Sequence, residues 1–324
     1  GYLPLAFDLL ADLLARPTYP EEAFRRRRDL LLAELRGERD DPGARAHQRL
    51  RAEVYGRHPF RRPTKGTPAS VARLRRKDLV EFHRRWFAPG RTIVAVSGDV
   101  EVAEVLDRAR RTLGRWRADP APLPLPPEPV PMPRGREILI PEPRAQVQAV
   151  LGHLGVRRDD PDFDALLLLD QVLGGGAGFT DRLSRRLRDE LGLAYSVHAD
   201  LTSTAGKERG LFSAAIGTGP EGFRAAIGEI RGEFRRLLRE PPTAAELRTA
   251  KDYLLGSHIL GLERNASRAL FLLQRERLAL GEDFLERYPA RIERIRERDV
   301  AAAARRHLRP HALTLVAVGP VRRG

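Results

Sequence analysis

The sequence predicts an α+β fold in two copies, each a mixed or antiparallel sheet with helices packed on it, the first copy being incomplete. Three observations indicate this fold. Short apolar runs typical of strands alternate with amphipathic helical stretches. A segment near residue 78 recurs near residue 299, and a proline-rich stretch separates the copies. The predicted organisation is a first domain at 1–118, a linker at 119–133 and a second domain at 134–324.

The first copy is predicted to be mainly helical. A leucine-rich amphipathic stretch at 3–16 ends at prolines. A second helix runs from Glu21 to a break at Asp40–Pro42, because the residue before a proline disfavours helical angles. The stretch GRHPFRRPTKGTP, at 56–68, has the punctuation of a loop. The remaining predicted elements of this copy are helices at 44–54, 78–87 and 102–113 and a buried strand at Thr92–Ser97.

Proline defines the linker. Residues 119–133 hold eight prolines in fifteen positions, which forces an extended and stiff connection. The second copy then alternates strands and helices. Its predicted strands lie at 137–141, 146–152, 193–202, 211–216 and 313–318, and its predicted helices at 162–173, 180–191, 220–239, 244–262, 267–280 and 299–308.

An internal repeat relates the two copies. The segment DLVEFHRRWFAPGRTIVAVSGDV, from Asp78, aligns without gaps with DVAAAARRHLRPHALTLVAVGPV, from Asp299, at an offset of 221 residues. Farther upstream the offset becomes 223, where Arg45 aligns with Arg268. The two domains are therefore interpreted as copies of one fold.

The repeat also predicts what the first copy lacks. The second copy begins near Arg134, so the first is expected to begin roughly 90 residues before Gly1. Gly1 is not a start methionine, and no signal peptide precedes it in the sequence. We therefore expect the chain to be a fragment or a processed product.

Composition favours solvated arginines over a nucleic-acid interface. Of 58 basic residues, 54 are arginines, a skew that a GC-rich genome produces, and the net charge is +14. Because the arginines lack interleaved aromatics and a nucleic-acid module, nucleic acid is not an expected partner. A basic nucleic-acid-binding protein stays as an alternative interpretation of the whole chain, which salt-sensitive affinity for DNA or RNA would support. With a mean hydropathy of -0.41, no membrane span is expected, and zero cysteines exclude thiolate metal sites and disulfides.

One stretch carries the strongest chemical signal: GGGAGFTDRLSRRLRDELGLAY, at Gly174–Tyr195. Its opening glycines are expected to supply backbone freedom, and Thr180 to cap a basic helix that Gly192 ends. The apolar positions of this helix are Leu183, Leu187 and Leu191. Arg188 then lies on the last turn and Tyr195 at the start of a strand. A guanidinium and a phenol are therefore expected to face one point.

The remaining candidate ligands give weaker signals. None of the eight histidines stands in H-E-x-x-H or H-x-x-E-H, and Pro310 interrupts the only close pair, His307 and His311. Glu34 lies in the amphipathic helix RRRRDLLLAELRGERDDP, where a glutamate is by default solvated or salt-bridged. Its counterpart in the repeat is Ser257, so the fold itself does not require an acid there.

Two regions resemble a known family. Residues 20–100 contain HPFRRPTKGTP and the pattern F-H-R-R-W-F-x-P…V-x-G-D-V, and GGGAGFTDRLSRRLRDELGLAYSV contains L-R-[DE]-x-x-G-L-x-Y. These segments resemble the inverted-zincin peptidases, the family of pitrilysin, insulin-degrading enzyme and mitochondrial processing peptidase. The resemblance covers essentially the whole chain. It implies that residues 1–118 are the C-terminal part of a catalytic-type domain and residues 134–324 a second, non-metal domain.

The resemblance implies a zinc-dependent endopeptidase. Glu34 matches the glutamate that completes a Zn2+ site with the two histidines of H-x-x-E-H, a motif absent from this chain and expected upstream. Zinc would activate water for attack on the amide, with the glutamate of that motif as general base. Arg188 and Tyr195 match residues that hold the substrate backbone and stabilise the oxyanion. The structural alternatives are that Arg188 is only a cation at a helix C-terminus and that Tyr195 is only a half-buried aromatic of a strand. The chain alone is not expected to hydrolyse peptides.

One departure favours a second hypothesis. Arg27 stands where the family often has another glutamate, seven residues before the ligand, so a non-catalytic subunit or structural partner of a two-chain peptidase is the alternative. In both cases the expected partners are an unfolded peptide, bound by strand addition, and a second pair of homologous domains, in the same polypeptide or a partner chain, that closes a clam-like chamber. The sequence does not select a compartment, and a bacterial cytoplasm or periplasm would both fit.

Overall fold

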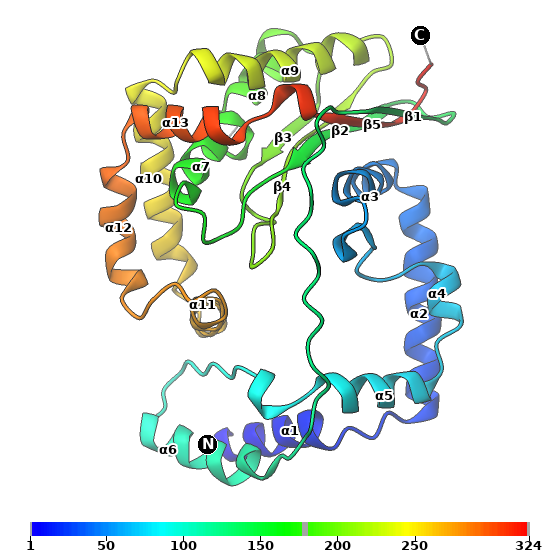
Figure 1. Cartoon of the computed structure of the whole chain (residues 1–324), viewed down its shortest axis with the longest axis vertical. Helices are drawn as coiled ribbons and strands as arrows, with labels where there is room; N and C mark the ends of the chain where they lie inside the picture. The colour runs from blue at the N-terminus through cyan, green and yellow to red at the C-terminus, as the bar shows by residue number, and fades with distance from the viewer. Residues whose placement is uncertain (1, 177–180, 323–324) are drawn as a thin grey trace. The chain divides into compact units, whose positions relative to one another are not determined.

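The predicted fold class is confirmed. The computed structural model describes residues 2–176 and 181–322, which form helices and one mixed five-stranded sheet (Figure 1). They belong to two compact units. The first is Gly1–Gly37, Lys65–Leu125 and Gly261–Leu280, and the second is Glu38–Thr64, Pro126–Leu260 and Gly281–Gly324. The predicted domain boundaries follow the sequence repeat instead and stay a prediction.

The helices and strands of the described residues divide between the two units. The first unit contains α1 (Leu3–Ala15), most of α2 (Glu21–Asp40), α4 (Pro68–Ala72), α5 (Arg76–Trp86), α6 (Val102–Thr112) and α11 (Asn265–Arg277). The second contains α3 (Pro42–Tyr55), β1 (Glu137–Pro141), β2 (Val147–Leu154), α7 (Phe163–Asp170), α8 (Arg182–Ser184), β3 (Ser196–Asp200), β4 (Leu211–Thr218), α9 (Phe223–Arg239), α10 (Ala244–Gly261), α12 (Phe284–Arg294), α13 (Glu297–His307) and β5 (Thr314–Gly319). No helix of the described part is both long and apolar enough to cross a bilayer.

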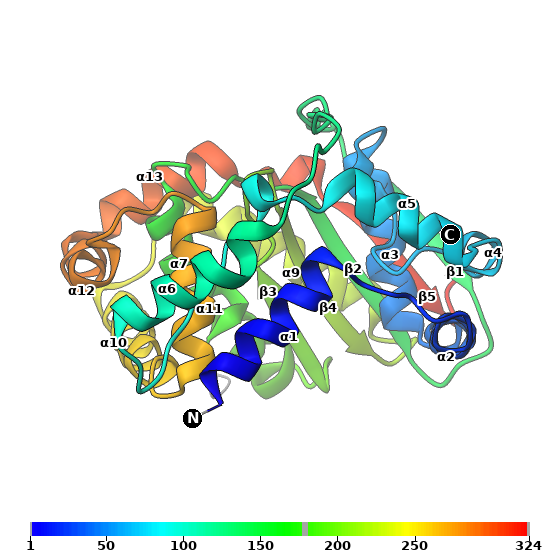
Figure 2. The ribbon, with the colours of Figure 1, turned by 90° about the horizontal axis from the view of Figure 1, so that it is seen from below.

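The sheet of the second unit has the order β1-β5-β2-β4-β3 (Figure 2). β1 and β5 are parallel, and the other neighbours are antiparallel. The strands β1, β4 and β5 therefore end at the same edge of the sheet. β3 is the last strand of this order, next to the loop that carries Tyr195.

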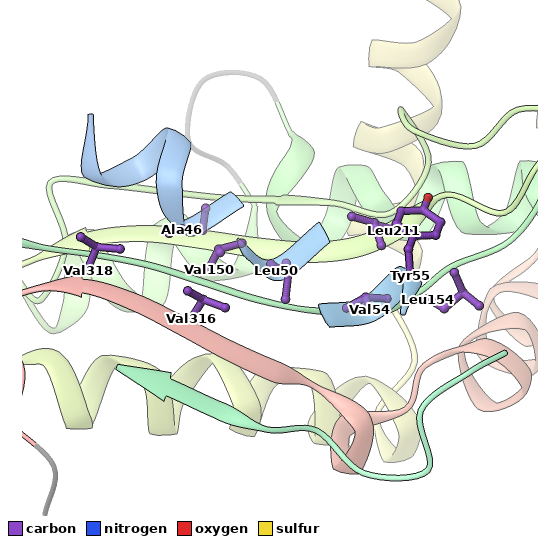
Figure 3. Packing of buried hydrophobic residues seen from close by; sticks show 10 residues of the cluster. Ala46, Leu50, Val54, Tyr55, Val150, Leu154, Leu211, Val316 and Val318 are labelled. Atoms are coloured by element: carbon purple, nitrogen blue, oxygen red, sulfur yellow. The ribbon is translucent and has the colours of Figure 1, made fainter. Parts of the chain in front are cut away.

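Helix α3 covers one face of this sheet. Ala46, Leu50 and Val54 recur every four residues along it and are nearly inaccessible to solvent. They pack onto Val150 of β2 and onto β5, whose residues Val316 and Val318 point to the same side (Figure 3). Asp41 accepts hydrogen bonds from the backbone N–H groups of Gly43 and Ala44 at 2.8 and 3.1 Å and so caps the helix.

Helix α3 belongs by sequence repeat to the first copy but packs on the sheet of the second. By sequence α3 lies in the first copy, yet its apolar face is buried in the second unit. At the offset of 223 its counterpart is α11, which lies in the second copy by sequence but in the first unit by contacts. Ala269 and Leu273 of α11 correspond to Ala46 and Leu50 and are only half-buried. The two copies have therefore exchanged equivalent helices between compact units.

The predicted buried strand at Thr92–Ser97 is wrong for the described residues. This segment has no strand pairing, and Ile93 and Val94 are 41% and 40% exposed. Their counterparts at the offset of 221, Thr314 and Leu315, lie in β5 with 0% exposure, between β1 and β2. A strand needs neighbours to satisfy its backbone groups, and the described part of the first unit contains no strand to pair with.

Helix α5 likewise exposes apolar residues whose counterparts on α13 are buried. Phe82 is 58% exposed, whereas its counterpart Ala303 on α13 is fully buried. Phe87 is 37% exposed and its counterpart Leu308 is 4% exposed. In the second unit α13 packs against α7 and α9. At the same offset α1 is the counterpart of α9, but the described part of the first unit contains no counterpart of α7. Apolar residues of the first copy are therefore exposed among the described residues at positions whose counterparts are buried in the second unit.

The other predicted helices and strands are present with shifts of a few residues. Two helices, α4 and α12, were not predicted. In α12 a local signal is misleading. Pro289 lies inside it, and a proline reads locally as a helix breaker. Burial of Phe284, Tyr288 and Ile292 on one face of the helix outweighs that local preference.

We expect Leu50→Ala to destabilise the second unit by about 2–5 kcal/mol, the usual cost of such a cavity in a core. Leu273→Ala, at the equivalent and half-buried position of α11, is expected to cost less than about 1 kcal/mol. Both tryptophans, Trp86 and Trp116, lie in the first unit. In urea titrations, Leu50→Ala should therefore shift the transition seen by circular dichroism and leave the tryptophan transition in place. Equal shifts for both variants would contradict the packing of α3 on this sheet.

Candidate functional site

The glycine-rich bend before the candidate site serves close packing rather than backbone freedom. Gly174 and Gly175 end a π-helical turn, η4 (Gln171–Gly175), that continues α7, and none of the three opening glycines has a positive φ. A Cβ on Gly174 would lie 2.5 Å from the backbone nitrogen of Ala199. The predicted flexible bend is therefore wrong, and glycine instead lets η4 touch the backbone of β3.

The helix after the bend is confirmed, with a different cap. The predicted cap Thr180 lies outside the described residues, and Asp181 caps the helix by accepting hydrogen bonds from the N–H and hydroxyl of Ser184 at 2.8 and 2.9 Å. The helix changes after Ser184 into a second π-helical turn, η6 (Arg185–Glu190), and π turns are frequent at functional sites. Gly192, with φ +60°, ends it as predicted.

Arg188 and Tyr195 are both on the surface. Arg188 is an exposed residue of η6, and Tyr195 is 87% exposed directly before β3. One backbone oxygen connects their neighbours: the carbonyl of Leu187 accepts hydrogen bonds from the N–H groups of Leu193 at 2.8 Å and Ala194 at 3.2 Å. Since Leu187 precedes Arg188 and Ala194 precedes Tyr195, the two side chains start from backbone that is fixed together.

Ion pairs tie η6 to helix α9. The Nε atom of Arg186 donates to Glu229 of α9 at 2.9 Å, and a second guanidinium nitrogen donates to Glu190 at 2.9 Å. These hydrogen bonds raise the pKa of Arg186. Arg186, two residues before Arg188, therefore anchors η6 to α9.

A second anchor lies at the start of α8. Arg182 donates to both oxygens of Glu246 at 2.7 and 2.8 Å and pairs with the buried Glu233 at 3.3 Å. Burial by itself would raise the pKa of Glu246, but hydrogen bonds from Arg182 and Thr243 outweigh it and lower this pKa to about 2. The bidentate geometry fixes α8 to α10.

Asp170 is a buried carboxyl group at the end of α7. Its oxygens accept hydrogen bonds from the N–H of Leu201 at 2.8 Å and the hydroxyl of Thr202 at 3.2 Å, which connects α7 to the end of β3. Burial raises its pKa to about 7, with a smaller contribution from the nearby Asp200. Asp170 therefore joins the end of α7 to the end of β3 that lies away from Tyr195.

Among the residues that the structure describes, Glu34 of α2 does not lie in a metal-ligating group. Its side chain is 42% exposed, and its carboxylate oxygens are 3.5 Å from a guanidinium nitrogen of Arg27 and 3.6 Å from the ammonium of Lys65. One carboxylate beside two cations does not fit Zn2+, which needs several neutral or anionic donors. Within the described residues, Glu34 thus has the geometry of a surface ion pair, and its role as a ligand stays a prediction.

Asp160, Asp162 and His307 form the one cluster with metal-ligand spacing in the part of the chain that the structure describes. Asp162 already accepts hydrogen bonds from Arg306 and, at 2.7 Å, from His307. The guanidinium supplies the positive charge that a cation would bring. This cluster is therefore an ion-pair network that joins the start of α7 to the end of α13.

Comparison with known proteins identifies the family. The sequence profile described as "Peptidase M16 inactive domain" matches residues 73–254. The chain belongs to the M16 peptidase family. A relative named as an uncharacterized zinc protease, from Mycobacterium bovis, is 32% identical over 98% of this M16 chain and 72% of its own length. The resemblance to inverted-zincin peptidases is confirmed.

Two further M16 relatives bear on the role of the chain. The crystal structure titled as a peptidase M16 inactive domain from Pseudomonas fluorescens has a TM-score of 0.90 at 28% identity and covers 98% of this chain and 74% of its own. A Helicobacter pylori protein named a non-peptidase homolog is 23% identical over 81% of this chain and 60% of its own length. The M16 relatives thus carry names of both kinds, protease and non-peptidase.

The sequence did not reveal how Arg188 and Tyr195 are held. The Leu187 carbonyl is a backbone group and leaves no signal in the sequence. The Arg186–Glu229 pair joins residues 43 positions apart, which no local pattern indicates. The one available signal was the run of four arginines between residues 182 and 188, of which two are used for anchoring.

We expect Asp170→Asn to stabilise the chain at pH 8 by about 2 kcal/mol or more, because one pKa unit is worth about 1.4 kcal/mol. The folded-state pKa of Asp170 is raised from 3.8 to about 7, so its contribution to stability is present at low pH and is lost as the pH rises through this interval. An asparagine can accept from Leu201 and donate to Thr202 at every pH.

The measurement is the free energy of unfolding in urea at pH 5 and pH 8. The gain from Asp170→Asn should be larger at pH 8. The control is Asp164→Asn, which loses the ion pair with Arg291 and should destabilise the chain at both pH values. A variant Asp170→Asn that is destabilised at pH 8 would contradict the raised pKa of the buried Asp170.

Proposed function

We propose that this chain holds the peptide substrate in a zinc-dependent endopeptidase of the M16 type. The observation that carries the proposal is the pair of exposed side chains, Arg188 and Tyr195, on backbone segments joined through the Leu187 carbonyl. Exposed tyrosines and arginines on rigid backbone are the residues that most often dominate binding to other chains. The family profile and relatives named zinc proteases support the same reading.

The chemistry of the pair suits a peptide backbone. A guanidinium and a phenol are both hydrogen-bond donors, and an extended peptide presents carbonyl oxygens as acceptors. Donors that are held in place also stabilise the negative charge that develops on a carbonyl oxygen when an amide is attacked. In this proposal Arg188 and Tyr195 bind the substrate backbone before cleavage and the oxyanion during it.

The strand β3 offers a second recognition element. It is the last strand in the sheet order and begins directly after Tyr195. Its outer edge can accept an unfolded segment as an added strand, which reads main chain more than sequence. The expected substrate is therefore an unfolded peptide of broad sequence.

The zinc ion of the proposed peptidase requires residues outside this chain. Glu34 is the residue that the family pattern assigns as a ligand, and Arg27 and Lys65 would have to release it. The described residues place no histidine in a metal-ligating group with Glu34. We therefore assign the hydrolytic chemistry to the complete protein or assembly.

A second candidate function is a non-catalytic partner of a two-chain peptidase. The ion pair between Arg27 and Glu34 favours it, because the carboxylate already has a cation. The relative named a non-peptidase homolog also supports it. In this case the chain would keep its peptide-holding residues and lack a metal site of its own.

Both candidates need a further sheet-bearing domain. Apolar residues of the first copy, such as Phe82 and Val94, are exposed, whereas their counterparts Ala303 and Leu315 are buried in the second unit. Exposed apolar surface of this kind marks an interface. We propose that homologous domains, in the same polypeptide or a partner chain, cover it and close the peptidase chamber.

In the complete protein, Arg188→Ala is expected to lower kcat/KM for an unstructured peptide about 100-fold, the usual effect of removing a donor to an oxyanion. Tyr195→Phe, which removes only the hydroxyl, should lower it about 10-fold or more. The matched control is Arg185→Ala on the same turn, whose side chain is 53% exposed and lies 3.7 Å from Glu246. We call Arg188 and Tyr195 together the clamp. If Arg188→Ala and Arg185→Ala have the same activity, the proposed clamp is wrong.

Glu34→Gln separates the two candidate functions. If Glu34 is a zinc ligand in the complete protein, the substitution should reduce zinc content, measured by atomic emission, and abolish peptide cleavage. For a non-catalytic partner, zinc content, peptide binding and turnover of the assembly should stay unchanged. Glu22→Gln, at a 92% exposed side chain of the same helix, is the control and should have no effect.

A further inference from the structure

The carboxyl end of β4 contacts the loop that carries Tyr195. Thr218, the last residue of β4, is 3% exposed, and its hydroxyl oxygen lies 2.6 Å from the carbonyl oxygen of Leu193. A carbonyl oxygen can only accept, so the hydroxyl of Thr218 donates this hydrogen bond. Leu193 is the second residue before Tyr195, and this contact acts on the backbone from which the phenol extends.

Both backbone polar groups of Leu193 are thus in use. Its N–H donates to the carbonyl of Leu187 at 2.8 Å, and its carbonyl accepts from Thr218. The direction of the next peptide units toward Tyr195 is therefore set from two sides.

The side chain of Leu193 is also confined. It packs against Gly222, the cap residue of α9, where an added Cβ would lie 3.0 Å from Leu193 Cδ2 and 3.4 Å from the hydroxyl oxygen of Thr218. A side chain at this position would press on the Leu193 methyl group. Glycine at this position therefore lets the start of α9 close tightly over the loop.

The arm that carries Arg188 is anchored on the same helix. Arg186, two residues before Arg188, pairs with Glu229 of α9 at 2.9 Å. β4 and α9 thus support both backbone segments of the candidate clamp. Thr218 of β4 holds the segment before Tyr195, and Glu229 of α9 holds the segment before Arg188.

We propose that Thr218 is a positioning residue for peptide binding, whose buried hydroxyl fixes the Leu193 carbonyl and so sets the direction of Tyr195. This inference rests on the proposed function, since it concerns the same clamp. Thr218 acts through the backbone and does not touch the substrate.

The test uses the complete protein and a fluorescein-labelled, unstructured peptide of mixed sequence, with binding measured by fluorescence anisotropy. Thr218→Val removes the hydroxyl with little change of shape and should weaken binding about 5- to 10-fold, the effect of one lost hydrogen bond. Thr218→Ser keeps the donor and should bind within about 2-fold of the wild type.

Two further measurements exclude a purely structural effect. Thr314→Val removes a buried hydroxyl that accepts from the N–H of Arg136 at 3.2 Å, at the opposite side of the sheet, and should leave peptide binding unchanged. In protein labelled with fluorotyrosine, the fluorine resonance of Tyr195, assigned through Tyr195→Phe, should move in Thr218→Val and return in Thr218→Ser.

The outcomes distinguish the inference from the proposed function. If Arg188→Ala weakens binding but Thr218→Val binds like the wild type, the positioning role is overturned and the clamp stands. If Thr218→Ser does not restore binding, or Thr314→Val weakens it equally, the effect is structural and the inference is overturned. If neither Arg188→Ala nor Tyr195→Phe alters binding, the clamp itself fails, and the role of Thr218 fails with it.

Discussion

The carbonyl oxygen of Leu187 is the point on which the candidate site depends. It accepts two hydrogen bonds, from Leu193 and Ala194, and so joins a π-helical turn to the strand that follows it. An α-helix would give this carbonyl an intrahelical partner, whereas the wider π turn and Gly192, with φ +60°, direct it toward the returning chain. The backbone segments that carry Arg188 and Tyr195 are therefore held together although six residues separate the two in the chain.

A second constraint comes from the duplication. The sheet of the second unit has helices on both faces, but the helix on one face, α3, comes from the first copy. Its buried face of Ala46, Leu50 and Val54 makes the second sheet dependent on the first copy for its core. A helix of the predicted first copy thus forms part of the core of the second unit. The exposed apolar residues of the first copy fit the same principle, because a sheet of this fold needs a layer on each face.

Most of the fold could be predicted from the sequence because it depends on periodicity and punctuation. The helices α1, α2 and α9 and the strand β1 follow directly from apolar spacing, proline and glycine. The strand predicted at Thr92–Ser97 failed because a strand is defined by neighbours, and the described part of the first unit has none. The opening glycines were predicted to supply backbone freedom. Gly174 is instead required because the backbone of Ala199 lies close to it, a contact that only the folded structure reveals.

The candidate site could be predicted only in part. The family pattern selected Arg188, Tyr195 and Glu34, and the first two are exposed on braced backbone. Glu34 has instead the ion pairs that composition alone suggested for a glutamate in an arginine-rich helix. The supports, Thr218 and Glu229, come from β4 and α9, tens of residues away in sequence, and no local signal distinguishes them.

Hydrogen–deuterium exchange of the complete protein, with and without an unstructured peptide, tests the central claim most directly. If this chain holds peptide through the clamp and the edge of β3, the backbone amides of residues 187–200 should exchange more slowly when peptide is bound, while those of α10 and α12 stay unchanged. Unchanged exchange at residues 187–200, together with measurable peptide binding, would contradict the account and place the peptide elsewhere.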